Sequence, residues 1–535
     1  MNKEPTRKDL GRRDMFLGTA AFATAAGMVA GTAVRPAQAQ VAAPVASAQT
    51  SRFEELSNLP FANDYPTAAT AQRLIDELLF ERGVQSYLWA LPAINMWAMK
   101  QGSEARFGAG YNVLPVWKQR VNAKTLVTTP NSDVIYAMGY VDLGKDGPLV
   151  IDVPPKLQGI LDDFWQRPVI GPTIDGHAFA GDVGFAGPDK GEGGKYLLLP
   201  PGYKGTVPDA GYFVYRPRTN NVFVFWRAFF TDPTKLAEPV ELIERTRIYP
   251  LGNEGSAKPM QFPDASNVPV DMLFPSDGSY FEMLSRFVDS EVVEPDQLGW
   301  LGMLAGIGII KGQPFAPDEH TKAILDSAAK TAFKTSKVLA FDVFPAKADE
   351  RIYTDRQWCS AFLGLYSKNC PDINFDFLWR SGAFLDLDAR INYFTLAYSV
   401  SPGMRSKVPG QGAAYLGGFR DSDGRLYDGS NTYRLHLPAG VPVANFWSLT
   451  LYDALTSSEL DNGQPFPSLG SHNQPVENPD GSFDLYLGPT APPGKEKNWL
   501  RTVPDKGYFV ILRLYGPTEP FLDQTWRPDD IEEMR

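Results

Sequence analysis

The sequence predicts an α+β protein in which two related β-sandwich domains follow an N-terminal helix and flank a helical middle region. The first observation behind this is an internal repeat, since similar segments return in the same order about 285 to 295 residues later. The second is a stretch between the repeats with apolar residues at helical spacing. The third is composition, because 12% aromatic residues with 45 prolines and 48 glycines fit short strands joined by turns.

Four segments in each half define the repeat. In the first half they are Pro148–Val153, Phe164-Trp165, Lys195–Leu199 and Gly211–Val214. In the second half they are Tyr433–Leu437, Phe446-Trp447, Phe483–Leu487 and Gly507–Val510. A long repeat of this kind indicates a duplicated structural unit, so we expect two related β-domains that face each other.

The first 39 residues are expected to be an export signal rather than part of the fold. Arg12-Arg13 precede a stretch of small and apolar residues, and Ala37-Gln38-Ala39 matches a cleavage site. The arginine pair is typical of a twin-arginine signal, with an ordinary secretory signal as the alternative. Cleavage after Ala39 predicts a mature chain that begins at Gln40 and works in the periplasm.

The charge and hydropathy of the mature chain argue against two kinds of partner. Removal of six basic and three acidic residues leaves 45 Lys and Arg against 59 Asp and Glu, a net charge of −14. Such an acidic protein gains nothing from neutralising phosphates, so we expect no nucleic acid partner. No apolar run of about 18 residues follows the signal, so we expect no membrane span.

Residues 40–66 are predicted to be a leader segment, and residues 67–232 the N-terminal β-domain with its leading helix. From Thr67 apolar residues recur at helical spacing, and Pro92 is expected to kink or end this helix. The strand Val222–Trp226 is too apolar for an exposed sheet edge, so we expect it inside a sheet.

Residues 233–410 are predicted to be mainly helical, and residues 411–535 to form the C-terminal β-sandwich domain. The helices are expected at Leu236–Ile248, Ser279–Asp289, Pro317–Leu339 and Asp386–Ser399. Gln357–Ser367 also has a helical pattern, which would hold Cys359 and Cys370 about 16 Å apart. A disulfide cannot span that distance, so we expect two separate thiols unless this helix ends early.

The most suggestive polar motif is Pro130-Asn131-Ser132-Asp133-Val134-Ile135-Tyr136. Its oxygens and its amide lie on a turn before an apolar strand, where they can point at one spot. The alternative is an Asx-turn at the strand entry, with Asp133 capping backbone N–H groups. For a functional site, Asp133 and Asp163 are the candidate acid and base, with Tyr136 as a further catalytic candidate and Asn131 as a substrate-binding one.

Aromatic residues of the second domain are candidates for a platform that binds a sugar or an apolar ring. Tyr452 and Trp499 are the candidate substrate-binding rings, whereas Trp447 faces the expected inter-sheet core. Arg513 is a candidate for binding a carboxylate. Because Arg513 lies between two leucines, it needs a partner if it is buried, and Asp453 or Asp484 could supply one.

Signatures of metals and cofactors are weak. None of the four histidines is spaced with another histidine or a cysteine as in a zinc site. No G-x-S-x-G elbow occurs, and the glycine-rich stretches lack the context of a phosphate-binding loop or a dinucleotide fingerprint. Asp421, Asp423 and Asp428 could hold calcium, but a hairpin turn is the alternative. We therefore expect no metal and no cofactor.

Two sets of motifs carry a resemblance to a known family. In the first half they are Pro130-Asn131-Ser132-Asp133, Tyr136, Asp142-Leu143, Gly194-Lys195-Tyr196-Leu197 and Pro200-Pro201-Gly202. In the second half they are Phe446–Asp453, Asn498–Leu500 and Arg513–Pro517. The first set resembles domain of unknown function 1254, and the second resembles its usual companion, domain of unknown function 1214. The resemblance implies two β-sandwich domains in an exported bacterial protein, and it carries over no catalytic residue.

The sequence favours an exported enzyme that acts on a small molecule or a glycan in a cleft between the two β-domains. Hydrolysis is the expected reaction class, because water is available outside the cell and nucleotide cofactors are scarce there. The alternative is a non-catalytic envelope protein that binds a ligand or serves assembly, and we expect at least a homodimer. Polar groups of both domains that converge, with a carboxylate of raised pKa, would favour the enzyme.

Overall fold

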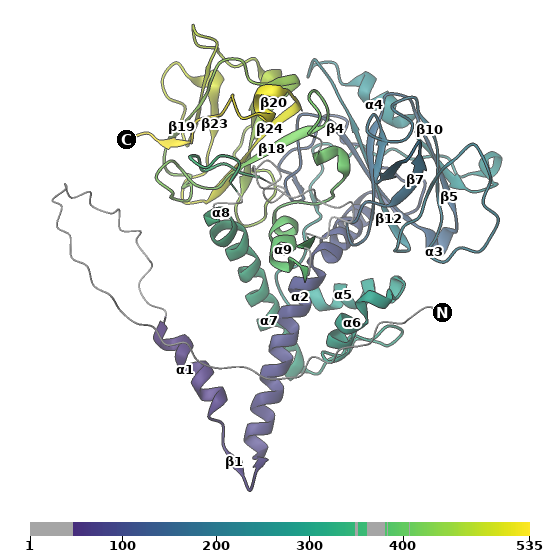
Figure 1. Cartoon of the computed structure of the whole chain (residues 1–535), viewed down its shortest axis with the longest axis vertical. Coiled ribbons are helices and arrows are strands. Elements are labelled where there is room, and N and C mark those ends of the chain that lie inside the picture. Colours follow the sequence, from purple (N-terminus) through teal and green to yellow (C-terminus); the bar gives the residue numbers. More distant parts are fainter. Residues whose placement is uncertain (1–45, 348–350, 361–379, 382–383, 406) are drawn as a thin grey trace, which may run out of the picture. The chain divides into compact units, whose positions relative to one another are not determined.

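The computed structural model describes residues 46–347, 351–360, 380–381, 384–405 and 407–535 (Figure 1). The predicted export signal and Cys370 lie outside these residues. The chain divides into two compact units at Thr70. No helix among the described residues is both long enough and apolar enough to cross a membrane.

The unit that ends at Thr70 holds a helix and a hairpin. α1 (Ala46–Ser57) is followed by β1 (Phe61–Ala62) and β2 (Tyr65–Pro66), which pair antiparallel. Asn63 and Asp64 join the two strands, both with positive φ (51° and 66°). Two successive residues of this kind make the tight turn whose twist suits a hairpin, and Asn and Asp tolerate it well.

The long helix α2 (Ala68–Phe107) contains Pro92 in its interior, so the prediction that Pro92 might end the helix was wrong. Side chains of other elements bind carbonyl oxygens near the proline. Gln166 Nε2 donates to Pro92 O at 2.6 Å, and the Arg390 guanidinium donates to Trp89 O. Tertiary hydrogen bonds and burial thus hold together a helix that proline alone would weaken.

The first β-domain is a sandwich of two four-stranded sheets. One sheet is antiparallel, in the order β4 (Ile135–Asp142), β12 (Asn221–Ala228), β6 (Gln158–Asp163) and β9 (Asp182–Gly184). The other has the order β11 (Phe213–Tyr215), β10 (Gly194–Leu198), β5 (Leu149–Val153) and β13 (Arg247–Pro250), with only β10 and β11 parallel. β12 is flanked on both sides, which confirms that Val222–Trp226 is not an edge strand. A hairpin of β7 (Ile170–Ile174) and β8 (His177–Ala180) is inserted before β9.

The second β-domain is also a sandwich. One sheet has the order β15 (Cys359–Ser360), β18 (Ala413–Gly418), β24 (Tyr508–Pro517), β20 (Val443–Asp453) and β21 (Ser468–Gly470). The other has the order β23 (Trp499–Arg501), β22 (Phe483–Gly488), β19 (Tyr433–Leu437) and β25 (Glu532–Glu533), with only β22 and β23 parallel.

The two sandwiches correspond strand for strand. In chain order, β4, β5, β6 and β9 to β13 match β18 to β25, with the same neighbours and the same directions. This correspondence confirms two related β-domains. Two pairings of sequence segments were wrong. Gly211–Val214 leads into β11, whereas Gly507–Val510 leads into β24, the counterpart of β12. Phe164-Trp165 follow the end of β6, whereas Phe446-Trp447 lie inside β20, the counterpart of β6. A glycine turn before aromatic and β-branched residues can begin any strand, so this local pattern does not identify which strand follows.

Helices dominate the region between the sandwiches, as predicted. The longer ones are α4 (Ala237–Glu244), α5 (Ser279–Ser290), α6 (Leu298–Ala305), α7 (Glu319–Val338) and α9 (Leu387–Leu396). Shorter elements are α3 (Leu143–Asp146), α8 (Phe344–Ala346), α10 (Glu519–Leu522), the π-helical η3 (Leu339–Val343), β3 (Thr125–Leu126), β14 (Val270–Asp271), β16 (Arg380–Ser381) and β17 (Phe384–Leu385). Short 3-10 turns are η1 (Glu254–Ser256), η2 (Pro295–Gln297), η5 (Pro402–Arg405), η6 (Ser471–Asn473) and η7 (Glu496–Asn498).

Two helix predictions were wrong where strands complete a sheet. The helix predicted at Leu236–Ile248 ends at Glu244, and β13 then pairs with the edge of β5. The helix predicted at Gln357–Ser367 is absent over its first residues, because Cys359 and Ser360 pair with β18. In both places an open sheet edge outweighs the local helical pattern. The thiol prediction for Cys359 and Cys370 stays open, since Cys370 is not described.

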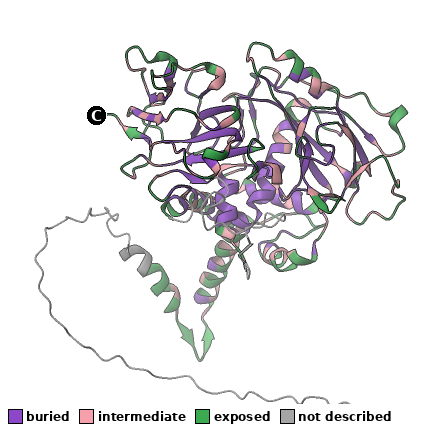
Figure 2. Cartoon of the chain, turned by 45° about the horizontal axis from the view of Figure 1, so that its top comes forward, coloured by how far each residue is buried: buried purple, intermediate pink, exposed green. Residues whose placement is uncertain are grey.

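The two faces of each central sheet have different roles. One face of the β4–β12–β6 sheet fills the first sandwich, with side chains such as Val224 and Trp226. The opposite face, with Tyr136 and Phe225, joins a hydrophobic cluster that also includes α2, α9 and the second β-domain. The buried colouring concentrates in the sheets and in the part of α2 beneath them (Figure 2). Side chains on the face that carries Tyr136 and Phe225 therefore lie between the two β-domains.

Candidate functional site

The turn 131–133 of the first domain contacts the second domain through all three of its side chains. The contacts are Asn131 Nδ2 to Tyr515 Oη, Ser132 Oγ to Glu459 Oε1, and Ser468 Oγ to Asp133 Oδ2 at 2.9 Å. All three residues of the turn are buried. The motif singled out in the sequence thus lies at the interface of the two β-domains.

The alternative prediction of an Asx-turn at this motif is right in part. Asn131 Oδ1 accepts a hydrogen bond from Asp133 N at 2.9 Å, which closes such a turn. Asp133 does not cap backbone N–H groups. Its Oδ1 accepts instead from Arg120 Nη2 at 3.1 Å, and its Oδ2 accepts from Ser468. Asp133 is therefore an ion-pair partner inside the interface.

Two hydroxyl groups connect Asp133 to Arg513. Arg513 Nη1 donates to Thr450 Oγ1 at 3.3 Å, Thr450 Oγ1 donates to Ser468 Oγ at 3.2 Å, and Ser468 donates to Asp133. Every donor points toward the carboxylate, so the groups polarise one another along the chain. The negative charge of Asp133 therefore stabilises Arg513 without touching it.

The carboxylates expected to pair with Arg513 are engaged elsewhere. Asp453 forms an ion pair with Lys506 and accepts from Leu455 N at 2.7 Å. Asp484 is hydrogen-bonded to His436 Nδ1 at 2.9 Å. The prediction that one of them partners Arg513 was wrong. In the folded chain Arg513 instead donates to hydroxyl and carbonyl oxygens near the domain interface, among them Thr129 O at 3.3 Å.

Arg227 of the first domain is the counterpart of Arg513. Arg227 on β12 is paired with Tyr136 on β4, and Arg513 on β24 is paired with Tyr415 on β18. The distance from the guanidinium carbon to the ring centre of the paired tyrosine is 5.9 Å in both cases. Each arginine also interacts electrostatically with the paired tyrosine of the other domain. The two arginines and two tyrosines thus form a reciprocal set across the interface.

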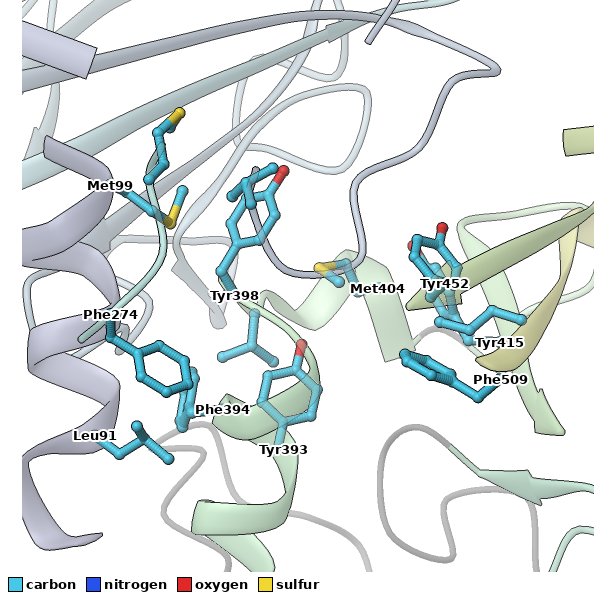
Figure 3. Close-up of a cluster of buried hydrophobic side chains, with 14 of the residues drawn as sticks. Leu91, Met99, Phe274, Tyr393, Phe394, Tyr398, Met404, Tyr415, Tyr452 and Phe509 are labelled. Atoms are coloured by element: carbon cyan, nitrogen blue, oxygen red, sulfur yellow. The ribbon is translucent and has the colours of Figure 1, made fainter. Parts of the chain in front are cut away.

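Neither arginine has a carboxylate partner among the residues that the structure describes. Arg227 Nη2 makes one weak contact, to Met404 Sδ at 3.8 Å, and its buried Nε has no hydrogen-bond partner. Burial lowers the pKa of Arg227 and Arg513, but the neighbouring tyrosines raise it further, and both pKa values lie above the ordinary one. Both side chains therefore stay positively charged. Figure 3 shows Tyr398 toward α2, Tyr415 and Tyr452 on the side of the second domain, and Met404 between Tyr398 and Tyr452.

Glu459 is a carboxylic acid at the same interface. Burial raises its pKa to about 8, and the charge of Asp133 adds to this, although the hydrogen bond from Ser132 and two arginine charges oppose it. Ser132 bonds to Oε1, whereas the buried Oε2 has no partner. Glu459 is therefore mostly protonated near pH 7, and its buried Oε2 has no hydrogen-bond partner among the described residues.

His472 is a second titratable group beside this interface. Its ring lies 4.8 Å from that of Phe230 and 4.4 Å from that of Phe446. Burial lowers its pKa, so the imidazole is neutral at pH 7. The buried Nε2 has no hydrogen-bond partner. A neutral imidazole with an unused nitrogen is able to accept a proton.

A cavity of about 50 Å³ runs along the same face of β18 and β24 as Arg513. It is lined by Thr129, Ala340, Phe344, Pro345, Cys359, Ser360, Asn392, Tyr393, Leu396, Ala397, Gly417, Phe419, Phe509 and Ile511. Thr129 links it to the interface, since its carbonyl oxygen accepts from Arg513. The buried Oδ1 of Asn392 has no partner. The cavity is thus mainly apolar with a polar border.

The structure brings most predicted site residues together. Asp133, Asn131 and Tyr136 lie at the interface as described, and Tyr452 Oη donates to Pro130 O there. Arg513 completes the group. The acid and base roles predicted for these residues stay predictions.

Asp163 and Trp499 lie elsewhere. Asp163 is paired with Val222, at the other end of β12 from Arg227, roughly 16 Å along the strand. It forms an ion pair with Arg167 at 2.6 Å, so the structure does not bring it to Asp133. The ring of Trp499 is on β23, where its Nε1 donates to Gly488 O at 2.9 Å.

Several site residues were missed in the sequence. They are Arg120, Arg227, Tyr415, Glu459 and His472. A signal for Arg227 exists, because Val224-Phe225-Trp226-Arg227 and Val510-Ile511-Leu512-Arg513 share valine and arginine at the same spacing. Glu459 and His472 carry no such signal, since only the fold brings their loops to the first domain.

The aspartates once considered for calcium form a turn. Asp421 Oδ1 accepts from Asp423 N at 3.0 Å and from Arg425 N at 2.8 Å, and Gly424 has a positive φ of 81°. Among the described residues no group of three or more His, Cys, Asp or Glu is placed to hold a metal ion. The local hydrogen bonds account for these aspartates as parts of a hairpin turn.

Two family models match the two sandwiches. One, described as Protein of unknown function (DUF1254), matches residues 111–250, and the other, Protein of unknown function (DUF1214), matches residues 412–519. The chain carries both domains, in this order. This finding confirms the resemblance seen in the sequence. The DUF1254 domain supplies Asp133 and Arg227 to the interface, and the DUF1214 domain supplies Glu459 and Arg513.

Solved structures with similarity to the chain include two bacterial proteins. The VPA0106 protein from Vibrio parahaemolyticus is 18% identical, with a TM-score of 0.47, and the match covers 85% of this chain and 100% of that one. An uncharacterized protein from Burkholderia cenocepacia is 13% identical, with a TM-score of 0.35, and the match covers 88% of this chain and 97% of that one. The search of curated proteins found no match.

Proposed function

We propose that the protein is an exported enzyme that acts on a small molecule at the interface of its DUF1254 and DUF1214 domains, with hydrolysis as the reaction class. The observation that carries the proposal is Glu459, a buried carboxylic acid with pKa of about 8 and an unpartnered Oε2. Enzymes tune acids and bases to the working pH in this way. The arginine pair and cleavage motif of the N-terminus support export.

In the proposed reaction Glu459 is the general acid. Its Oε2–H gives a proton to the leaving oxygen or nitrogen of the substrate as that bond breaks. The oxygen of a water molecule forms the new bond to the substrate, and His472 Nε2 accepts the proton that the water loses. Solvent then returns a proton to Glu459 and removes one from His472, so the enzyme is unchanged after each cycle.

The predicted residues have supporting roles in this proposal. Asp133 holds Arg120 and the hydroxyl chain to Arg513, so it positions groups of the site. Asn131, Tyr136 and Tyr452 border the place where a substrate binds. Trp499 has no role in this proposal, because its ring lies outside the interface, where Nε1 donates to Gly488 O.

A non-catalytic protein that binds a ligand is the second candidate. The observation that favours it is that Asp133 Oδ2 and the hydroxyl of Tyr452 already bind groups across the interface, while Asp133 Oδ1 is bound to Arg120 of its own domain. Bonds of this kind are expected of a structural contact between domains. This candidate predicts a ligand without turnover.

The test compares Glu459→Gln with Glu291→Gln. Glu291 is also a buried glutamate whose pKa burial raises, to about 7, but it binds Asn220 and Asn221 away from the interface. Mature protein and both variants are incubated with panels of esters, amides and glycosides. We expect one class to be hydrolysed, with turnover lost in Glu459→Gln and kept in Glu291→Gln. Absence of turnover would favour the binding protein, and equal turnover in both variants would show that Glu459 is not the general acid.

A further inference from the structure

The duplication places two arginines beside the same two tyrosines. Arg227 and Arg513 occupy equivalent strand positions, and each interacts with Tyr136 and with Tyr415. The residues two positions further along, Phe229 and Tyr515, have ring centres 6.3 Å apart. Equivalent residues that contact one another place a pseudo-twofold axis between the two strands, as in an isologous interface.

Other buried arginines of the chain show what a structural role looks like. Arg167 is hydrogen-bonded to Asp163 and to Glu294, at 2.6 and 2.8 Å, and Arg120 is paired with Asp133. Burial of a charge is costly unless an opposite charge compensates it. Arg390 has no carboxylate partner within the described ranges either, but it is enclosed between α2 and α9 and donates to a helix carbonyl.

Arg227 and Arg513 differ from Arg120 and Arg167 because neither has a carboxylate partner among the described residues. Arg513 is buried and Arg227 is partly buried, whereas Phe229, next to the axis, is 44% exposed. Within the described part of the chain, the buried Nε of Arg227 and Oγ of Ser448, which is paired with Arg513, have no hydrogen-bond partner. The site therefore has positive charge and unused hydrogen-bonding groups close to an exposed aromatic residue.

We infer that Arg227 and Arg513 together bind the carboxylate group of a small organic acid, with one guanidinium from each domain. This inference rests on the site of the proposed function and names its substrate class. Guanidinium groups match carboxylates in shape and charge. The aromatic rings beside them, Phe225 at 4.8 Å from Arg227 and Tyr452 at 5.5 Å from Arg513, suit the organic part of the ligand better than a hydrated inorganic anion.

The experiment measures binding by calorimetry, without any turnover. Mature wild-type protein is titrated with acetate, benzoate, 4-phenylbutyrate and succinate, and with inorganic phosphate and sulfate. We expect an organic acid to bind the wild type, and Arg227→Met and Arg513→Met each to weaken this binding by roughly 10- to 100-fold, because each removes hydrogen bonds to a charged group. Arg513→Lys keeps the positive charge but loses the paired N–H donors of the guanidinium, so an intermediate loss of affinity is expected.

A control variant and the choice of measurement make the outcome unambiguous. Arg434→Met removes an exposed arginine that pairs with Glu532 and should bind like the wild type. Because the titration measures binding without turnover, a failed hydrolysis assay and a failed binding assay are distinguishable. The inference is overturned if none of the organic acids binds, if phosphate or sulfate binds as tightly as the best organic acid, or if the folded Arg227→Met and Arg513→Met variants bind like the wild type.

Discussion

Arg227 and Arg513 are equivalent residues of two sandwiches with the same topology, and each guanidinium carbon lies 5.9 Å from the ring of its paired tyrosine. Duplicated domains that face each other place equivalent side chains on both sides of one axis. The site therefore combines residues of both domains. Neither domain alone contains both arginines and Glu459.

The two classes of buried arginine should respond differently when the charge is removed. Arg167→Met leaves Asp163 buried without its ion-pair partner and Glu294 with Arg218 alone, so it should lower the free energy of unfolding by about 3–5 kcal/mol. Arg227→Met leaves no carboxylate behind and should change it by less than about 1 kcal/mol, or stabilise the ligand-free protein. Urea unfolding followed by circular dichroism measures both. A loss for Arg227→Met as large as that for Arg167→Met would mean that Arg227 has a structural role.

The hydroxyl chain between the domains can be interrupted at one atom. Ser468→Ala leaves Asp133 Oδ2 buried without the hydrogen bond that Ser468 provides at 2.9 Å. We expect a loss of about 1–3 kcal/mol in the free energy of unfolding, from the unsatisfied carboxylate oxygen. Ser471→Ala, on a half-buried residue whose hydroxyl accepts from Trp447 N, is the control. Equal and small effects of the two substitutions would show that the hydroxyl chain contributes little to the free energy of unfolding.

The fold could be predicted in outline because the duplication and the hydrophobic periodicity are properties of the chain itself. Two central strands, Val222–Trp226 and Trp447–Tyr452, are recognisable from β-branched and aromatic runs. The edges could not be predicted. Arg247–Pro250 and Cys359–Ser360 are strands only because β5 and β18 offer them free backbone groups, and these partners are distant in sequence.

The site could be predicted only where one segment holds several polar residues. The turn 131–133 and Arg513 stood out, since charged or polar residues beside apolar strands need partners. Glu459 and His472 could not be recognised, because their environment depends on contacts between the domains. Asp163 was misleading for a local reason, since an aspartate at a strand end also closes a turn, as its counterpart Asp453 does.

Two buried aspartates of the first domain predict a loss of stability as the pH rises. Burial raises the pKa of Asp162 to about 8 and of Asp182 to about 7. Because the pKa values of both aspartates are raised in the folded state, the two groups contribute fully to stability below about pH 4. This contribution is lost as the pH rises to about 8. Asp162→Asn mimics the protonated form and keeps an acceptor for Ser399 and Val400. We expect this variant to be more stable than the wild type at pH 8 and equally stable near pH 4. Melting temperatures of the variant and the wild type that differ by the same amount from about pH 4 to pH 8 would contradict the prediction.

For Lys337 we expect the opposite dependence of stability on pH. Burial lowers its pKa to about 7, although Asp453 opposes this, and Nζ donates to Ser457 Oγ at 3.0 Å. The unfolded chain binds this proton more tightly than the folded chain does. The charged lysine therefore destabilises the folded protein fully below about pH 7, and this destabilisation disappears toward pH 10. Lys337→Met should therefore be more stable than the wild type at pH 6, with the difference vanishing at pH 10. A difference in melting temperature that is independent of pH would show that the lysine charge is not the cause.

A crystal structure of the mature protein, grown with the organic acid that binds most tightly, tests the central claim most directly. The account predicts electron density for the acid at the interface of the two β-domains. One or both carboxylate oxygens should lie within hydrogen-bond distance of Arg227 and Arg513, and Glu459 Oε2 should face the ligand. Density for the acid away from both arginines, or an interface that stays empty at a saturating concentration, would contradict it.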